Sequence, residues 1–178
     1  MSEFSESYHL RSERAEDACD LLRQLGIAGY VYPASSGWVT FVAEGGSFEP
    51  DQRIASAARQ PLLHYVSAED HGWSFTLFDR GEVVSAYRCD WNDDVTFDDS
   101  RYSRATLQRL IPSAQTTALE DFEQRLHPAD FDELFESEPS KLFAQAVGLE
   151  HYDWLAYDYI ARDFHDSPDE FRHVTKIQ

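Results

Sequence analysis

The chain has 178 residues, of which 42% are hydrophobic and 14% aromatic, and 33 acidic against 15 basic residues give a formal net charge of −18. This length and this aromatic content exclude a disordered chain and predict one packed domain over residues 1–178. Acidic residues are spread along the whole chain, so its surface is expected to repel phosphates, which argues against nucleic-acid and membrane-surface binding.

Targeting and redox features predict a cytoplasmic protein. The N-terminus has neither a basic start nor an apolar run, and no stretch of about 18 apolar residues follows. The two cysteines, Cys19 and Cys89, belong to no CxxC pair and are predicted to be buried thiols.

The first third of the chain predicts two helices around two strands. Apolar residues at helical spacing predict a helix from about 12 to 25, with Ser12 as its cap and Gly26 at its end. Short strands are expected at 29–32 and 38–42, and Pro50 can open a helix that runs to about 59.

The clearest pattern is a three-stranded antiparallel meander at 62–67, 73–78 and 83–89. Trp73, Phe75 and Leu77 alternate with polar neighbours, as in a strand with two different faces. Gly81 stands where a tight hairpin turn needs a positive φ.

The second half predicts helices that begin near 103, 117, 128 and 139, the last of which ends at Gly148, and then a closing strand at 154–160. The predicted fold class is α+β, with a mostly antiparallel sheet of about five to six strands and a helix-rich C-terminal half packed on it. Within one domain, we expect a sheet-rich part at 1–92, a helix-rich part at 101–148 and a peripheral tail at 164–178.

No motif in the chain names an activity. The run Asp90-Trp91-Asn92-Asp93-Asp94 begins like a calcium loop, but Val95 and Arg101 stand where such a loop needs glycine and glutamate. No GxSxG, GxxxxGK[ST], GxGxxG or HExxH occurs. A cysteine nucleophile needs a histidine nearby in space; Cys89 with His64 is possible across neighbouring strands, but nothing in the sequence selects this pair. The sequence therefore predicts no catalytic residue, no metal ligand and no cofactor.

Two stretches, Gly72–Asn92 and Lys141–Ile160, resemble small bacterial α+β proteins in which a β-meander is followed by helices and a closing aromatic strand. The resemblance implies this order of elements and carries no functional residue with it. By size and charge alone, the chain is also similar to the acidic immunity proteins of contact-dependent toxin systems.

The leading functional prediction is a non-enzymatic, acidic protein-binding domain of the immunity or inhibitor type, with a basic protein as its partner. Acidic side chains would steer the partner and exposed aromatic side chains would anchor it. The candidate residues are Asp90, Trp91, Asp93, Asp94, Asp98, Asp99, Asp130, Asp132, Glu133 and Trp154. The alternatives are a protein that is acidic only for solubility, and a small-molecule binder or motif-less enzyme. The small-molecule or enzyme site would lie between sheet and helices and use Trp73, Tyr87, His64 or Tyr157.

Overall fold

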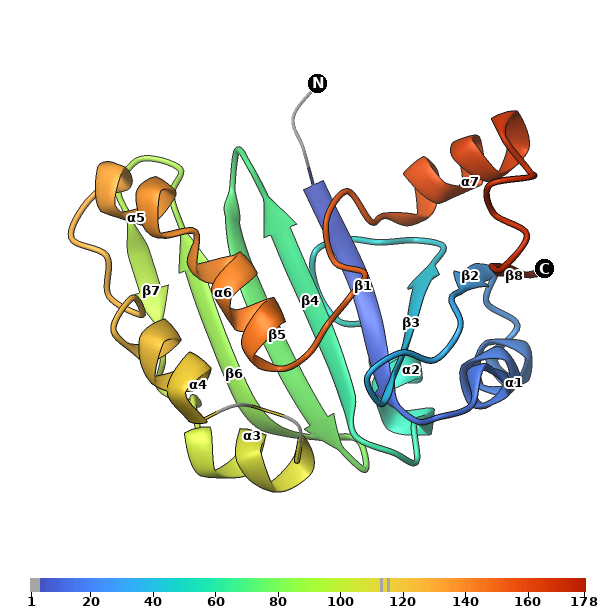
Figure 1. The fold of residues 1–178 in the computed structure, drawn as a ribbon, viewed down its shortest axis with the longest axis horizontal. Helices are drawn as coiled ribbons and strands as arrows, with labels where there is room; N and C mark the ends of the chain where they lie inside the picture. The colour runs from blue at the N-terminus through green and yellow to red at the C-terminus, as the bar shows by residue number, and fades with distance from the viewer. Residues whose placement is uncertain (1–3, 113, 115) are drawn as a thin grey trace.

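A computed structural model describes residues 4–112, 114 and 116–178, and its strands form one antiparallel sheet. The sheet has eight strands in the order β7-β6-β5-β4-β1-β3-β2-β8 (Figure 1), rather than the five to six expected. The strands are β1 (Phe4–Arg11), β2 (Gly29–Val31), β3 (Trp38–Ala43), β4 (Leu62–Ala68), β5 (Gly72–Asp79), β6 (Glu82–Asp90), β7 (Thr96–Asp98) and β8 (Thr175–Ile177).

Seven helices in the described residues complete an α+β fold. They are α1 (Ala15–Leu25), α2 (Gln52–Ala57), α3 (Arg104–Leu110), α4 (Thr116–Glu123), α5 (Phe131–Ser137), α6 (Pro139–Ala146) and α7 (Tyr157–Asp166). None of the helices described is long and apolar enough to cross a membrane.

The meander β4–β5–β6 is confirmed, with Leu77 paired to Leu63 on one side and to Ser85 on the other. Arg80 and Gly81 both have positive φ, 52° and 83°, which is the backbone that a two-residue hairpin turn requires. The predicted end of α1 is confirmed as well, because Gly26 adopts φ 63° there.

Residues 154–160 do not form the predicted closing strand; most of them belong to α7. Tyr157, Ile160, Ala161 and Phe164 recur at helical spacing and pack on the sheet beside Tyr30. The strand that extends the sheet is instead β8, in the tail that was predicted to be peripheral. It pairs with β2 and buries Ile177.

Strand β1 was missed because its sequence lacks an apolar stripe on one face. Ser5, Ser7 and His9 face the same side and are buried. This central strand therefore carries polar side chains where the sequence pattern of a strand predicts apolar ones. Their hydrogen bonds explain why this is tolerated. Ser7 Oγ and Thr40 Oγ1 each lie 2.9 Å from a ring nitrogen of His9, and buried polar groups need such partners.

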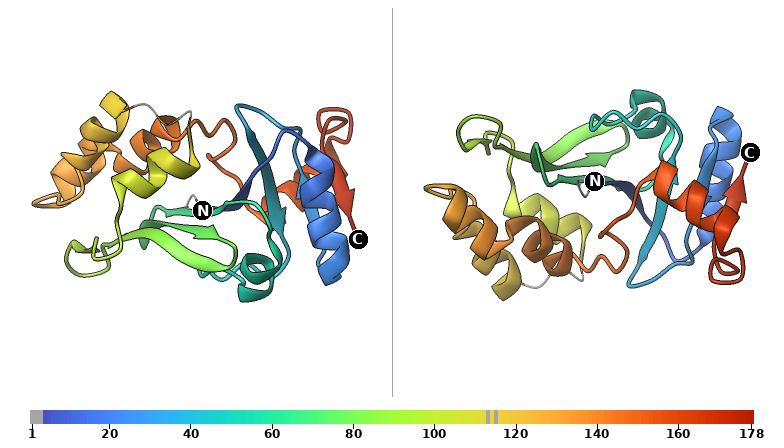
Figure 2. Two further views of the ribbon diagram at one scale, coloured as in Figure 1. Left: turned by 90° about the horizontal axis from the view of Figure 1, so that it is seen from below. Right: turned by 90° about the horizontal axis from the view of Figure 1, so that it is seen from above.

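Helices cover the two faces of the sheet unequally (Figure 2). Helices α3–α6 pack on the β4–β6 half of one face, where Trp73, Phe75 and Tyr87 meet Phe122 and Phe143 in a dense aromatic core. Helix α7 covers β2 and β3 on that same face, and α1 and α2 pack on the opposite face.

Strands β1 and β3 diverge at one end of the sheet. Strand β1 pairs with β4 from Phe4 to Leu10, but with β3 only from Tyr8 to Arg11. The backbone of Leu155 fills part of this gap, since its carbonyl accepts a 2.8 Å hydrogen bond from the N–H of Glu6. The chain that leaves β3 therefore arches over the start of β1 instead of continuing beside it.

Candidate functional site

The β6–β7 segment and the β4–β5 hairpin meet at one end of the sheet. The backbone N–H of Trp91 donates to the carbonyl of His71 (3.1 Å), and its indole N–H donates to the carbonyl of Glu69 (2.8 Å). These two bonds fix the Trp91 ring just beyond the last residue of β6.

Helix α5 brings two further aromatic rings to this end, at the upper left of Figure 1. Phe135 lies edge-on to Trp91 with ring centroids 5.7 Å apart, and Phe131 stacks on Phe135 at 6.3 Å. Phe135 is 53% exposed and Phe131 36% exposed. The spacing of Phe131, Leu134 and Phe135 predicts that all three point inward, but α5 buries only Leu134 and leaves both phenylalanine rings at the surface.

A groove of about 160 Å³ opens beside these rings, between the sheet and the start of α6. Its apolar walls are Trp73, Trp91, Leu134, Phe135 and Pro139. We call it the α5 groove. Trp73 is 1% exposed, and its indole nitrogen is the one buried side-chain polar atom without a hydrogen-bond partner among the described residues. The groove therefore offers mainly apolar and aromatic contact.

The rim of the α5 groove is mostly acidic. Glu69, Glu138 and Asp153 line it, and Lys141 is the one basic residue in its lining, ion-paired with Glu138 at 2.7 Å. Asp93 and Asp94 are exposed in the turn that follows Trp91. Acidic residues also neighbour one aromatic cluster, made of Trp91, Phe131 and Phe135: Asp93 and Asp94 follow Trp91, and Asp132 lies on α5 beside Phe131.

Two of the candidate residues on α5 hold the helix in place. Asp130 accepts a hydrogen bond from the N–H of Glu133 (2.9 Å), and Glu133 accepts one from the N–H of Ala129 (2.8 Å). This pattern is a variant of the capping box, in which Glu133 reaches back to the N–H of the residue before the N-cap Asp130. Asp132, one residue into the helix, is exposed.

Of the ten candidate residues, only Trp91 lines the α5 groove. Asp90 ends β6 and is half-buried. Asp98 lies on β7, where the N–H and hydroxyl of Ser100 lower its pKa, and Asp99 accepts a 2.7 Å hydrogen bond from His127. Trp154 is 52% exposed and contacts Tyr159 instead, with ring centroids 6.1 Å apart.

The pairing of Cys89 with His64 is wrong. Cys89 lies in the core under α3–α6, where burial raises its pKa to about 11. His64 points from the opposite face of the sheet and hydrogen-bonds to Glu6 at 3.2 Å. The two residues are also separated in register, because Cys89 pairs with Trp73 and His64 with Thr76.

A second Ser–His arrangement, Ser7 with His9, is equally remote from solvent. Both side chains are 0% exposed, and burial lowers the pKa of His9 to about 3, with His151 and His64 adding to the effect. A substrate in solution cannot reach this pair, so we assign the pair a structural role in the core. No group of three or more metal-binding side chains occurs in the part of the chain that the structure describes.

Of the four residues predicted for the alternative small-molecule site, only Trp73 lines the α5 groove. Tyr87 is buried and donates a 2.5 Å hydrogen bond to the carbonyl of Leu126, His64 faces away, and Tyr157 lines a separate cavity between the start of β1 and the loop that follows β3. Sites for drug-sized molecules usually measure about 300 Å³ or more. The α5 groove is smaller and suits a side chain of a larger partner.

Comparison of the chain with protein-family models, curated proteins and solved structures found no match. The resemblance to small bacterial α+β proteins stays a prediction. What bears on function is therefore the geometry of the described residues.

Proposed function

We propose that the protein is an acidic protein-binding domain of the immunity or inhibitor type, which captures a basic segment of a partner protein at the α5 groove. The observation that carries the proposal is a cluster of three aromatic rings, with Phe131 and Phe135 exposed and Trp91 half-buried, beside a groove whose rim is mostly acidic. Aromatic side chains are the usual anchors of protein interfaces.

The chemistry of the groove defines the partner segment. Acidic residues on the rim and in the β6–β7 turn attract arginine or lysine over a distance and accelerate association. An apolar side chain of the partner fits between Phe135, Leu134 and Pro139.

The proposal is tested with two dye-labelled synthetic peptides whose binding is followed by fluorescence anisotropy. One alternates arginine with leucine, and the other replaces each arginine with glutamate. We expect the basic peptide to bind and the acidic one not to. The double variant Phe131→Ser/Phe135→Ser should weaken binding of the basic peptide about tenfold or more, which corresponds to about 1.4 kcal/mol.

A matched control separates this groove from general stickiness. Phe97 is 44% exposed on β7, outside the α5 groove, so Phe97→Ser should leave the affinity within about twofold. Equal losses in Phe97→Ser and in the double variant would contradict the proposal. So would wild-type affinity in the double variant, or binding that vanishes at physiological salt, since charge alone would then account for it.

A further inference from the structure

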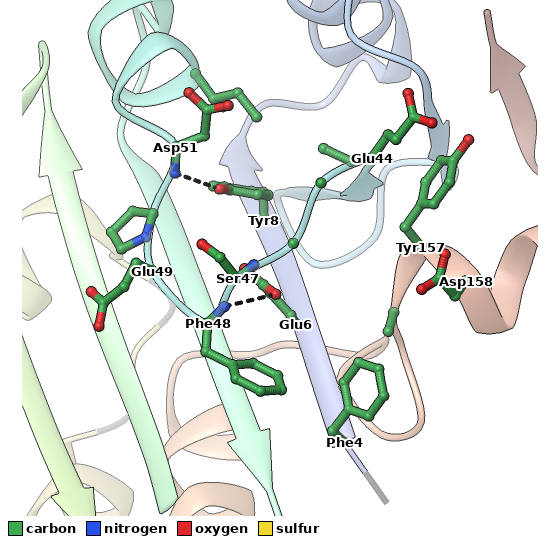
Figure 3. Close-up of a pocket in the computed structure, with 16 residues that line it drawn as sticks. Phe4, Glu6, Tyr8, Glu44, Ser47, Phe48, Glu49, Asp51, Tyr157 and Asp158 are labelled. Atoms are coloured by element: carbon green, nitrogen blue, oxygen red, sulfur yellow. Dashed lines mark hydrogen bonds between the residues drawn. The ribbon is translucent and has the colours of Figure 1, made fainter. Parts of the chain in front are cut away.

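A separate cavity of about 490 Å³ lies where β1 and β3 diverge (Figure 3). Three segments enclose it: the start of β1, the loop over residues 44–51, and the first residues of α7. We call it the β1–β3 cavity. It shares no lining residue with the α5 groove, and its volume lies within the usual range of small-molecule sites.

The loop that roofs the β1–β3 cavity is tied to β1 by three hydrogen bonds. The carboxylate of Glu6 accepts from the N–H groups of Ser47 (3.4 Å) and Phe48 (3.1 Å), and the hydroxyl of Tyr8 accepts from the N–H of Asp51 (2.8 Å). Gly46 lies close to this carboxylate, since a Cβ there would come within 2.5 Å of a Glu6 carboxylate oxygen and would displace it. The cavity is thus a built feature with a fixed roof.

Phe48 is held in an unfavourable backbone conformation at this roof. Its φ is 61°, in the left-handed region that a bulky residue rarely adopts. Its ring packs edge-on against Phe4 with centroids 5.5 Å apart. Strain of this kind is typical of ligand-binding loops, and here it turns an aromatic ring toward the cavity.

All the charged residues in the cavity lining are carboxylates: Glu6, Glu44, Glu49, Asp51 and Asp158. Two of these charges are paired with arginine within the described chain, Glu49 with Arg88 and Asp51 with Arg53, and Glu6 forms a hydrogen bond with His64. Glu44 and Asp158 form no ion pair with any described residue.

Glu44 and Asp158 lie on the same side of the cavity as the Tyr157 ring (Figure 3). Burial raises the pKa of Tyr157, and the charges of Glu44 and Asp158 raise it further. Both carboxylates therefore act on the hydroxyl group of Tyr157. Opposite them, Phe4 and Phe48 supply apolar wall. Negative charge on one side and aromatic rings on the other suit a ligand with a positive head and an apolar body.

We propose that the β1–β3 cavity binds a small organic cation, whose ammonium group lies between Glu44 and Asp158 and whose apolar body lies against Phe4, Tyr8 and Phe48. A nucleotide or another anion is disfavoured by every charge in the lining. A bare metal ion is disfavoured as well, since no metal-binding group of side chains occurs in the described residues. The Tyr157 ring lies on the same side as the two carboxylates, where cation–π attraction favours an ammonium group over a neutral head group.

The test uses three probes of one shape: 2-phenylethylamine, the neutral 2-phenylethanol and the anionic phenylacetate. Affinities are measured by ligand-observed NMR titration at low salt. We expect the amine to bind about tenfold more tightly than the alcohol, and phenylacetate to bind less than either. An amine that binds no better than phenylacetate would overturn the proposal, and so would an amine that shows no binding below about 10 mM.

Variants locate the binding. Glu44 and Asp158 are exposed at the cavity mouth, so Glu44→Gln/Asp158→Asn should fold normally, lose about tenfold in amine affinity and keep the affinity for the alcohol. The control Asp132→Asn/Glu136→Gln removes two charges from α5 and should leave amine affinity unchanged. Equal losses in the two double variants would overturn the proposal. The basic-peptide assay at the α5 groove is independent of this result, because the two sites share no residue.

Discussion

At the scale of single residues, the most constrained side chain is Glu6. It is 8% exposed, yet it accepts hydrogen bonds from His64 and from two backbone N–H groups of the roof loop. Burial opposes its ionisation, but the hydrogen bonds from His64 and Phe48 outweigh burial and lower its pKa below the ordinary value of 4.5. One carboxylate thus links the sheet to the roof of the β1–β3 cavity.

Replacing Glu6 with glutamine should destabilise the protein at neutral pH. The side-chain NH2 group of the glutamine cannot accept the hydrogen bonds that a carboxylate oxygen of Glu6 accepts. The donors left without an acceptor cost about 1–3 kcal/mol of unfolding free energy. Because the folded pKa of Glu6 is depressed, its stabilisation is present above pH 4.5 and is lost as the pH falls through the folded pKa. Urea unfolding of both proteins at several pH values should give a difference that shrinks below pH 4.5.

The control for this experiment is Glu136→Gln, an exposed carboxylate on α5. It should change the unfolding free energy by no more than about 0.5 kcal/mol at either pH. A Glu6→Gln effect that stays constant from pH 7 to pH 3 would contradict an ionised, hydrogen-bonded Glu6.

At the scale of elements, α5 shows how a short helix is held in place while it exposes two rings. It has seven residues and buries only Leu134, so packing alone stabilises it little. The capping-box variant of Asp130 and Glu133 satisfies backbone donors at its start. The helix that presents Phe131 and Phe135 therefore depends on its cap.

Asp130→Ala should cost about 1 kcal/mol of unfolding free energy, because it leaves the N–H of Glu133 without its acceptor. The neighbouring Asp132→Ala removes the same charge without removing a cap and should cost no more than about 0.5 kcal/mol. Urea unfolding of the two variants measures the difference. Equal effects would mean that charge, and not capping, accounts for the loss.

Elements with a regular pattern could be predicted from the sequence, and elements without one could not. The meander alternates apolar and polar residues along β5, and α1 ends at a glycine, so both were predicted and confirmed. Strand β1 was missed because Ser5, Ser7 and His9 fill a buried face that the sequence pattern expects to be apolar. Strands β7 and β8 have three residues each, too few to show any period.

The candidate site was predictable in composition but not in geometry. The two acidic segments and Trp91 could be named from the sequence, because exposed acids cluster there. The contact between Trp91 and Phe135 depends on how α5 packs beside β6, which no local pattern encodes. Phe131 and Phe135 have the spacing of buried residues on α5, and only the absence of a covering element leaves them exposed. The β1–β3 cavity was missed because its wall comes from three distant segments.

At the scale of the whole molecule, acidity unites the two proposed sites. Even if all 15 basic residues were paired, 18 of the 33 acidic residues would remain unpaired. The excess carboxylates of the folded protein therefore repel one another, and together they attract cations of every size. A basic segment at the α5 groove and an organic cation in the β1–β3 cavity would both gain from the same field.

This repulsion should make the fold more stable in salt at neutral pH. Screening shortens the range of charge interactions from about 10 Å at 0.1 M to about 3 Å at 1 M. The ion pairs that salt also weakens are mostly exposed and contribute at most about 1 kcal/mol each, so the loss of repulsion should dominate. Urea unfolding at pH 7 should show an unfolding free energy that rises over the first few tenths of molar sodium chloride and then levels off.

The same titration at pH 4.5, close to the isoelectric point calculated from the sequence, is the control. There the net charge approaches zero, so the early rise with sodium chloride should disappear. A gradual increase that continues to high salt at both pH values would indicate salting-out of apolar surface instead of charge screening. A decrease at pH 7 would mean that the ion pairs stabilise the fold more than the excess carboxylates destabilise it.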